Sequence, residues 1–305
     1  MRKKLSVLLV LSLSMIMLFT GCGTKEGTKN STTPEATSAP EATTAPETTK
    51  APEATTAPEA TGGTFKVGLE AAYAPFNWTQ LDDSNGAVKI DGNAEYAGGY
   101  DVEIAKKIAE GLGKELVIVK TDWEGLLPAL ISGKIDAIIA GMSPTALRKE
   151  TIDFSANYYK SNLVMVVKKG GAYESATSIQ DFKGAKITAQ LGTFHYTVIE
   201  QIDGVDMQPA MDNFSAMRVA LEAGMIDGYV SERPEGVSAS SANENFAFVD
   251  FTEGFETSDD DTAIAVGLIK DSELTNQINE ILAGISEEEQ TSIMDAAILN
   301  QPAAE

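Results

Sequence analysis

Two patterns of apolar residues alternate along the chain from Thr64 onward. In one, apolar residues recur every three or four positions, as in residues 101–111, so they lie on one side of a helix. Glycines at the end of the pattern mark the end of the helix. The other is a short continuous apolar run, such as residues 116–119, which is typical of a strand buried on both faces of a sheet. This alternation predicts an α/β protein.

The expected elements follow from these patterns. We expect strands at residues 66–70, 116–119, 135–140, 163–168, 186–190, 227–231 and 262–268. We expect helices at residues 101–111, 123–131 and 213–223, and two more at the end of the chain. The last of these should begin with a capping box between Ser286 and Glu289. Two alternating units, with a late return of the chain to the first, predict two lobes with a ligand cleft beyond the carboxyl ends of the strands.

The first residues of the chain have a different character. Basic residues at positions 2–4 precede an apolar run over residues 5–19, which is too short to span a bilayer comfortably. Residues 1–21 are therefore expected to be a secretory signal peptide. The segment resembles the lipobox of bacterial lipoproteins, with Phe19 where Leu is usual, and this implies that Cys22 is lipidated and anchors the protein to the membrane. The alternative is ordinary secretion with an incidental cysteine.

Residues 22–63 are expected to be a disordered linker that starts at the lipidated cysteine. Prolines recur every six residues from Pro34 to Pro58, among Thr, Ala and Glu. Large apolar side chains are absent, so nothing offsets the entropy lost on ordering the segment, and it should act as an extended spacer. A spacer of this kind favours a Gram-positive-type cell surface, with the folded part held on the extracellular face of the cell membrane.

Charge and rare residues exclude several classes of function. The 305 residues carry a formal net charge of -22, which repels phosphate backbones and makes a nucleic-acid partner unexpected. The single Cys excludes an intrachain disulfide and a multi-cysteine zinc site, and the single His leaves little for metal or relay chemistry. No metal and no cofactor is therefore expected.

Residues with suitable chemistry for a small charged ligand follow several expected strands. Ser143 and Arg148 follow the strand at 135–140, where a guanidinium can hold a carboxylate through two hydrogen bonds. Gly192 and Thr193 lie where a strand turns into a helix, so that free backbone N–H groups can attract an anion. The alternatives are a surface arginine and a plain turn with a helix cap.

Acidic and aromatic residues complete the candidate set. Glu232 follows the strand at 227–231 and can accept hydrogen bonds from an ammonium, although a lone glutamate is more often solvated. Glu70 ends the first strand and can face a ligand or orient its neighbours. Aromatic rings follow Glu70 or begin a helix, namely Tyr73, Phe76, Trp78 and Trp123. Such rings can cover a ligand, but aromatic residues more often belong to the core, and the alternative for Phe76 is that it simply packs the lobe.

Three segments resemble, in order, the polar amino-acid class of extracellular solute-binding proteins, which are the receptors of ABC uptake transporters. They are residues 67–76 (VGLEAAYAPF), residues 99–105 (GYDVEIA), and residues 133–145 (GKIDAIIAGMSPT) together with Arg148. The resemblance covers residues 65–282, with residues 81–97 as an insertion. It implies a periplasmic-binding-protein-like fold of type II, with two crossover strands and a ligand cleft between the lobes. Lobe 1 would comprise residues 64–163 and 263–305, and lobe 2 residues 164–262.

The resemblance also implies roles for individual residues. Arg148 and the backbone of Thr193 would hold an α-carboxylate, and Glu232 would hold the α-ammonium with Ser143 and the carbonyl of Gly141. Many relatives have Asp at the position of Glu232, and the longer side chain shifts the geometry. Trp123 and Tyr73 would stack on the ligand's side chain, and Glu70 would face its distal group. The complete expected set is Glu70, Tyr73, Phe76, Trp78, Trp123, Gly141, Met142, Ser143, Arg148, Gly192, Thr193, Phe194 and Glu232.

The function implied is capture of a free amino acid, polar or cationic by preference, and its delivery to the transmembrane subunits of an ABC permease. The protein is expected to be a monomer and not an enzyme. Two alternatives remain open, a secreted dehydratase-like enzyme on the same fold and a surface sensor or adhesion module. His195 is expected to be an exposed helix residue, and Asp259–Asp261 a solvated loop.

Overall fold

The computed structural model describes residues 62–302. The expected signal peptide at 1–21, the lipidation site Cys22 and almost all of the linker at 22–63 lie outside the described residues. None of the helices within 62–302 has the length and apolar character needed to cross a membrane.

The first sheet has five strands in the order β6-β1-β7-β14-β8. Its strands are β1 (Thr64–Leu69), β6 (Glu115–Lys120), β7 (Ala137–Ile138), β8 (Asp153–Lys160) and β14 (Ala263–Leu268). Strand β1 is parallel to β6 and β7, whereas β14 is antiparallel to β7 and β8. Because β1 and β14 lie inside the sheet, their apolar side chains are fully buried, as the continuous apolar runs predict.

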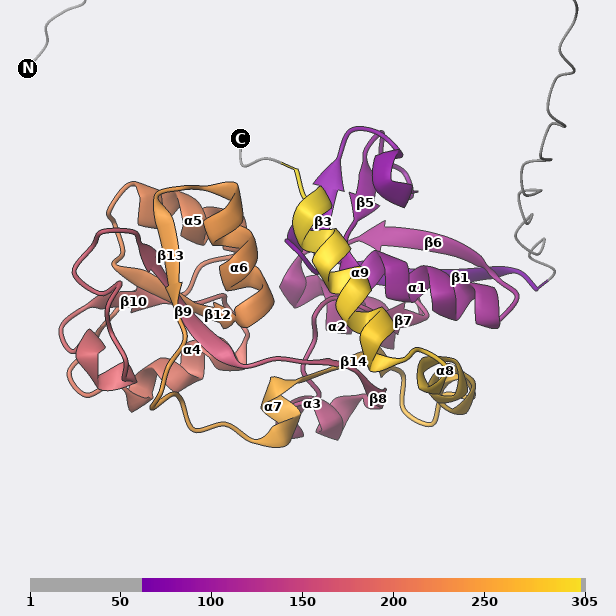
Figure 1. Cartoon of the computed structure of the whole chain (residues 1–305). Helices are drawn as coiled ribbons and strands as arrows, with labels where there is room; N and C mark the ends of the chain where they lie inside the picture. Colours follow the sequence, from indigo (N-terminus) through magenta and orange to yellow (C-terminus); the bar gives the residue numbers. More distant parts are fainter. Residues whose placement is uncertain (1–61, 303–305) are drawn as a thin grey trace, which may run out of the picture. The chain divides into compact units, whose positions relative to one another are not determined.

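The helices of the same lobe are α1 (Tyr100–Gly111), α2 (Trp123–Ile131), α3 (Ala146–Thr151), α8 (Leu274–Ala283) and α9 (Glu287–Asn300). Helix α1 contacts α8 and α9, and α2 packs on β1 (Figure 1). The expected cap of α9 is half formed, because the N–H of Glu289 donates to Ser286 Oγ while the carboxylate of Glu289 pairs with Lys107.

The second sheet has five strands in the order β11-β10-β12-β9-β13. They are β9 (Leu163–Lys168), β10 (Lys186–Thr188), β11 (Asp206–Met207), β12 (Gly228–Glu232) and β13 (Phe246–Val249). Strand β10 is parallel to β11 and β12, and β9 is antiparallel to β12 and β13. The helices here are α4 (Phe194–Thr197), α5 (Phe214–Glu222) and α6 (Arg233–Ala242), with 3-10 turns at Ile179–Phe182 and Val198–Gln201.

The chain passes between the two sheets twice, from β8 to β9 and from β13 to β14 (Figure 1). The prediction of two α/β lobes with two crossing segments is therefore confirmed. The second crossing contains α7 (Asp259–Thr262), so the expectation of a loop at Asp259–Asp261 is wrong. A capping box built by Ser258 and Asp261 starts this short helix, which explains why three consecutive acidic residues adopt it.

Residues 81–97 extend a separate four-stranded sheet in the order β2-β3-β5-β4. Its strands are β2 (Ala72–Tyr73), β3 (Asn77–Gln80), β4 (Val88–Lys89) and β5 (Tyr96–Gly98), with a 3-10 turn at Ser84–Gly86. The insertion therefore supplies β4 and most of β5. The expected strand at 135–140 shrinks to β7, because only two of its residues pair with β1.

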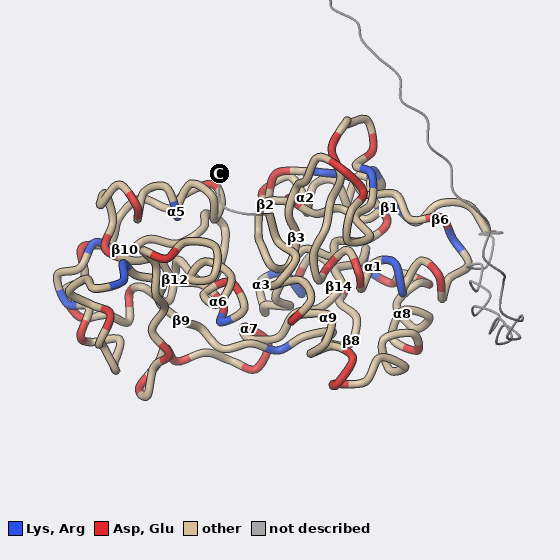
Figure 2. Tube along the Cα trace, turned by 45° about the horizontal axis from the view of Figure 1, so that its top comes forward, with Lys and Arg blue, Asp and Glu red and all other residues tan. Residues whose placement is uncertain are grey.

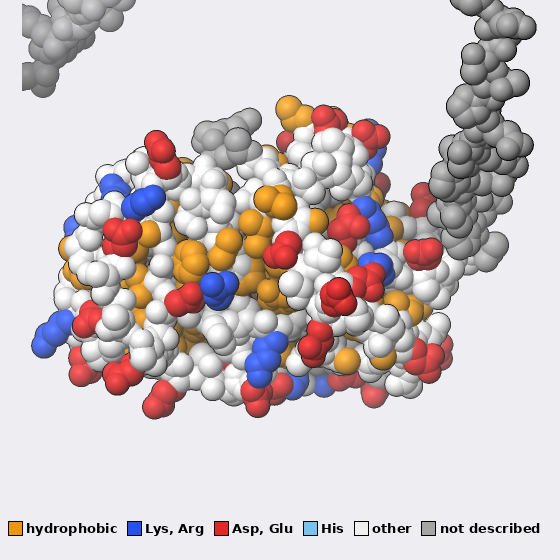
Figure 3. All heavy atoms as spheres, viewed as in Figure 1, with side chains coloured by type: hydrophobic (Ala, Val, Ile, Leu, Met, Phe, Trp, Pro, Cys, Tyr) orange, Lys and Arg blue, Asp and Glu red, His pale blue; other side chains and the backbone are white. Residues whose placement is uncertain are grey.

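Buried apolar side chains form two clusters. The smaller one lies on the second sheet and includes Met165, Phe182 and Ile187. The larger one combines side chains from both sheets, including Phe65 and Phe214. Acidic and basic residues are interspersed along both sheets and their helices (Figure 2). Apolar side chains gather near α6 on the face that Figure 3 shows.

Candidate functional site

The carboxyl ends of the parallel strands in both sheets supply one small cavity. From the first sheet, the segments after β1, β6 and β7 bring Tyr73, Trp123, Gly141, Ser143 and Arg148 to it. From the second sheet, the segment after β10 and the end of β12 bring Gln190, Thr193, Phe194, His195 and Glu232. The strand-end rule for open α/β sheets thus places the cavity where the sequence predicts a cleft.

Arg148 lies in the first half of α3, and the hydroxyl of Thr145, the N-cap residue before the helix, accepts the N–H of Arg148. Its guanidinium donates to the carbonyl of Ser143 at 2.9 Å and to the carbonyl of Gly192 at 3.3 Å, and it lies 5.1 Å from the ring centre of Trp123. Burial lowers the pKa of Arg148 to about 10, an effect that the charge of Asp261 partly opposes. The guanidinium still carries its full charge at neutral pH.

Arg148 forms no ion pair with any carboxylate between residues 62 and 302. A largely desolvated cation without a counter-ion is unfavourable, and only two of its five N–H donors have a partner. The geometry therefore suits an anion that approaches between the two sheets.

The turn after β10 faces Arg148 from the second sheet. Thr193 is the residue before α4, and its hydroxyl donates to the carbonyl of Gln190 at 2.7 Å. Gly192 has a φ of +71°, a conformation that favours glycine, and its carbonyl accepts hydrogen bonds from Arg148 and from Trp123 Nε1 at 3.5 Å. The expected residues Gly192 and Thr193 thus meet Arg148 and Trp123.

Glu232 ends β12 with only 2% of its surface exposed. One carboxylate oxygen, Oε1, lies 2.9 Å from His195 Nε2, whereas Oε2 is buried with no hydrogen-bond partner in the described residues. Burial raises the pKa of Glu232 to about 8 and lowers the pKa of His195 to about 3. The two groups therefore form a hydrogen-bonded pair at neutral pH and not an ion pair.

The expectation that His195 is exposed is wrong. The residue is 4% exposed, because α4 has a single turn that packs directly against β12. A lone histidine within a short predicted helix gave no signal of burial. The signal that could have found it is its place two residues after Thr193, at the end of a strand.

Glu70 follows β1 and is 5% exposed. Its Oε2 accepts a hydrogen bond from Gln190 Nε2 at 2.9 Å, and its Oε1 is buried without a partner in the part of the chain described. Burial raises the pKa of Glu70 to about 7, helped by the charges of Asp122 and Asp101 and opposed by the bond from Gln190. Gln190, which the sequence analysis did not single out, connects this acid to the cavity.

Tyr73 stacks on Phe214 of α5, with ring centres 4.1 Å apart and an interplanar angle of 10°. Its hydroxyl is buried and lacks a partner within residues 62–302. Gly141 lies beneath the same ring, with a φ of +62°, and a Cβ there would come within 2.8 Å of Tyr73 Cε1. A side chain at position 141 would therefore displace Tyr73.

A buried polar network supports Gly141 from behind. The N–H of Gly141 donates to the hydroxyl of Tyr158 at 3.3 Å, and that hydroxyl donates to Asp101 Oδ1 at 2.7 Å. Asn77 donates to the other oxygen of Asp101 at 2.8 Å. Burial raises the pKa of Asp101 to about 6, against the effect of these hydrogen bonds. Asp101 belongs to the GYD segment, whose place in the site the sequence alone did not reveal.

Five expected residues do not line this cavity. Glu70 and Gly192 are bonded to the lining residues Gln190 and Arg148, and the other three lie farther from it. Phe76 is fully buried and packs on Tyr73, Tyr100 and Tyr159, in line with the alternative of a core residue. Met142 is buried, and its carbonyl accepts the N–H of Ala265.

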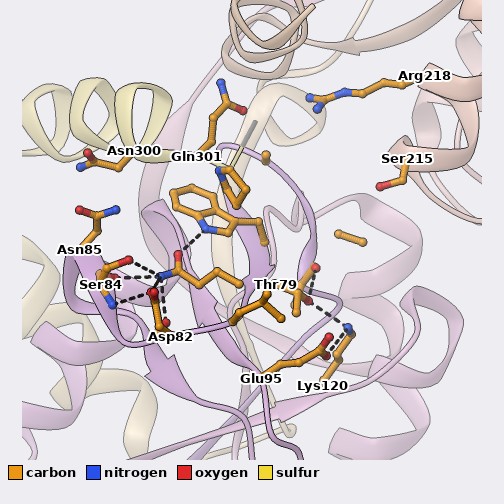
Figure 4. Close-up of a pocket in the computed structure, with 17 residues that line it drawn as sticks. Thr79, Asp82, Ser84, Asn85, Glu95, Lys120, Ser215, Arg218, Asn300 and Gln301 are labelled. Atoms are coloured by element: carbon orange, nitrogen blue, oxygen red, sulfur yellow. Dashed lines mark hydrogen bonds and ion pairs between the residues drawn. The ribbon is translucent and has the colours of Figure 1, made fainter. Parts of the chain in front are cut away.

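Trp78 donates to Gln80 and lines a different hollow of about 790 Å³. Figure 4 shows this hollow between the small sheet with its Ser84 turn, Arg218 of α5 and the end of α9 at Asn300 and Gln301. The side chains that project into it are mostly polar or already paired, such as Lys120 with Glu95 and Arg218 with Glu235.

The space enclosed between the residues of the candidate site is about 10 Å³, close to the size of one water molecule. An amino acid is several times larger. Entry of such a ligand therefore requires Arg148 and Gly192, which belong to different sheets, to separate.

Several known proteins are similar to this chain. A probable histidine-binding protein of Campylobacter jejuni is 37% identical over 165 residues, which is 54% of this chain and 58% of that protein. The arginine-binding extracellular protein ArtP of Bacillus subtilis is 29% identical over 226 residues, covering 71% of this chain and 78% of that one. A crystal structure of an amino acid ABC transporter substrate-binding protein from Streptococcus pneumoniae bound to L-arginine superposes with a TM-score of 0.69 at 28% identity, over 77% of this chain and 94% of that chain.

The two-lobed architecture of type II is shared with these solved structures. The profile of one family matches residues 65–297, which contain both sheets and every residue of the candidate site. The chain belongs to the bacterial extracellular solute-binding proteins, family 3.

Proposed function

We propose that this protein captures a free amino acid, with a cationic side chain preferred, by closing its two lobes around it. The observation that carries the proposal is that one cavity holds both the guanidinium of Arg148, which has no counter-ion within residues 62–302, and the buried carboxyl of Glu232, whose Oε2 has no partner there. An α-amino acid is a zwitterion that supplies a counter-ion for each.

The carboxylate end of the ligand would bind between Arg148 and the start of α4. When the lobes separate, the bond from Arg148 to the Gly192 carbonyl breaks and leaves an N–H group of the fork free for a carboxylate oxygen. The backbone N–H of Thr193 would serve the other oxygen. The position of Arg148 on Trp123 limits the motion of the guanidinium, which reduces the entropy lost on binding.

The ammonium end would bind at Glu232 Oε2, with Ser143 and the carbonyl of Gly141 as further acceptors. Glu232 Oε2 is buried without a partner in the described chain, so an ammonium would satisfy it and keep the carboxyl ionised. Removing the α-ammonium from the ligand should therefore cost more affinity than removing an equally large apolar group.

The distal end of the ligand would extend along Tyr73 towards Glu70. Glu70 Oε1 has no partner in residues 62–302, and a guanidinium, ammonium or imidazole would supply one. Relatives of this chain carry names that specify arginine or histidine, and the solved structure from Streptococcus pneumoniae contains L-arginine. We therefore rank arginine first, then histidine and lysine.

The remaining elements of the proposal concern the assembly in which the protein acts. Lobe 1 would comprise residues 64–163 and 263–305, and lobe 2 would comprise residues 164–262. The ABC permease subunits would recognise the form in which the two lobes are closed. The protein would act as a monomer on the outer face of the membrane, held through a lipid on Cys22, and it would release its ligand chemically unchanged.

Isothermal titration calorimetry of the purified protein, unfolded and refolded to remove any bound ligand, tests this function. Saturable binding of arginine at micromolar or lower concentration is expected, with weaker binding of glutamine. Mass spectrometry of the released ligand should give the intact amino acid. If none of the common amino acids bound, the proposed function would be wrong, and a chemically altered ligand would point to an enzyme.

A further inference from the structure

His195 and Glu232 form a buried contact that the amino-acid-binding role does not by itself require. His195 lies in α4 and Glu232 at the end of β12, and both line the candidate site. The distance from Nε2 to Oε1 is 2.9 Å, and the two side chains are 5% and 3% exposed. Packing of α4 on β12 holds them together within one lobe, so the contact persists when the lobes separate.

Each partner has one further polar atom that nothing satisfies. Glu232 Oε2 and His195 Nδ1 are both buried, and neither has a hydrogen-bond partner in the described residues. A buried acceptor without a donor is costly, so Glu232 Oε2 is a site for a group that carries N–H donors, whereas His195 Nδ1 points away from Glu232 on the far side of the ring. A primary ammonium has three such donors.

We propose that His195 positions the Glu232 carboxylate for the ligand's α-ammonium, with Nε2–H donating to Oε1 and with Oε2 left as the acceptor that faces the ammonium. This inference rests on the proposed amino-acid-binding function and assigns a specificity residue to it. His195 acts here as a neutral donor, so it adds no positive charge next to the carboxylate.

The length of Glu232 gives a physical reason for such a partner. Glutamate has one more rotatable bond than aspartate, so its carboxylate has more orientations to lose when it binds a ligand. A hydrogen bond to one oxygen fixes the orientation of the carboxylate before the ligand binds. The other oxygen is then available to the ligand in one fixed direction. Because burial keeps the imidazole uncharged, His195 achieves this without competing electrostatically with the ligand's ammonium.

A pair of ligands isolates the ammonium in a binding test. Arginine and δ-guanidinovaleric acid share the carboxylate and the guanidinium, and only arginine has the α-ammonium. The wild type should prefer arginine strongly. His195→Phe should lower the affinity for arginine about 10-fold or more and change the affinity for δ-guanidinovaleric acid little. His195→Gln retains an amide donor and should recover most of the preference.

The outcomes separate the inference from the function on which it rests. If the wild type bound no amino acid, the proposed function itself would fail. If the wild type preferred arginine and His195→Phe weakened both ligands by the same factor, or neither, His195 would be structural only and the inference would be overturned. For another preferred amino acid, the same comparison uses that acid and its counterpart without the α-amino group.

The imidazole can be observed directly, because His195 is the only histidine in the chain. With a histidine-free purification tag, nitrogen-15 NMR of the arginine complex should show a single neutral ring protonated at Nε2, with no titration between pH 5 and 8. A ring protonated at Nδ1 in the complex, or one that titrates near its ordinary value, would overturn the inference even if the binding preference were lost in His195→Phe.

Discussion

Arg148 donates a hydrogen bond to the carbonyl oxygen of Gly192 at 3.3 Å, and this bond joins a helix of the first sheet to the turn after β10 in the second. The same guanidinium bonds the Ser143 carbonyl of its own lobe. Arg148 is therefore held by its own lobe and bonded across to the other, so that separation of the lobes would break the second bond and leave the first.

Arg148→Ala should lower amino-acid affinity by about 100-fold or more, because it removes a charge-assisted carboxylate contact in a site with little water. Isothermal titration calorimetry measures this loss. Lys149→Ala is the matched control, since Lys149 is the next residue and forms an exposed ion pair with Asp260. Equal losses in the two variants would mean that Arg148 acts through general surface charge.

Glu70→Gln should change which amino acid binds and not whether one binds. The substitution removes the negative charge behind Gln190, so the affinity for arginine should fall about 10-fold or more while that for glutamine changes little. Glu150→Gln, at an exposed position of α3, is the control. A parallel loss for arginine and glutamine would show that Glu70 orients neighbouring groups and does not face the ligand.

The ligand-free protein should lose stability as the pH rises from 6.5 to 8. Burial raises the pKa of Glu232 to about 8, above its value in the unfolded chain, so the folded form retains a proton that the unfolded form releases. The contribution of Glu232 to the free energy of unfolding is therefore fully present below pH 4.5 and is lost as the pH rises through the folded pKa. Between pH 6.5 and pH 8 the loss should be at most about 2 kcal/mol. Glu70, with its pKa raised to about 7, adds to the loss in the same direction.

His195 does not disturb this window, because its lowered pKa affects stability only below pH 6.5. Urea unfolding at pH 6.5 and pH 8 measures the difference. Glu232→Gln should remove the contribution of Glu232, and saturating amino acid should reverse the trend. An identical pH dependence in the wild type and Glu232→Gln would contradict the assigned cause.

Phe214→Ala should destabilise the folded protein by about 3 kcal/mol, because it deletes a fully buried ring that stacks on Tyr73. Tyr73→Phe should change stability by less than about 1 kcal/mol, since its buried hydroxyl has no partner among the described residues. Val219→Ala on the exposed side of α5 is the control for helix propensity. Urea unfolding distinguishes the three variants, and a large effect of Tyr73→Phe would reveal a hidden partner.

Tyr158→Phe should weaken binding through the backbone of Gly141. The lost hydroxyl donates to Asp101 and accepts from Gly141, so the variant leaves a buried carboxylate short of a donor and should cost about 2 kcal/mol of stability. Tyr159→Phe, at the next position and half-buried, is the control. Affinity measured at a temperature where both variants remain folded should fall in Tyr158→Phe alone.

Much of the fold could be predicted because local patterns are strong here. The helix at Trp123–Ile131 and the strand at Leu163–Lys168 have the predicted bounds, since glycines and apolar runs mark their ends. The strand at 135–140 was overestimated, because an apolar run shows that a segment is buried but not how many of its residues pair with a neighbour.

The sequence by itself determined the alternation of strands and helices, and with it the strand ends where Arg148, Thr193 and Glu232 lie. Only the tertiary structure decided that His195 is buried against Glu232, that Gln190 bonds Glu70, and that Trp78 faces a different hollow. The physical reason is that the His195–Glu232 contact joins residues 37 positions apart and the Gln190–Glu70 contact joins residues 120 positions apart. The place of Trp78 depends on which side of its strand the ring occupies. Periodicity reports the environment of a residue along its own element, whereas the partner it meets is set by how the elements pack.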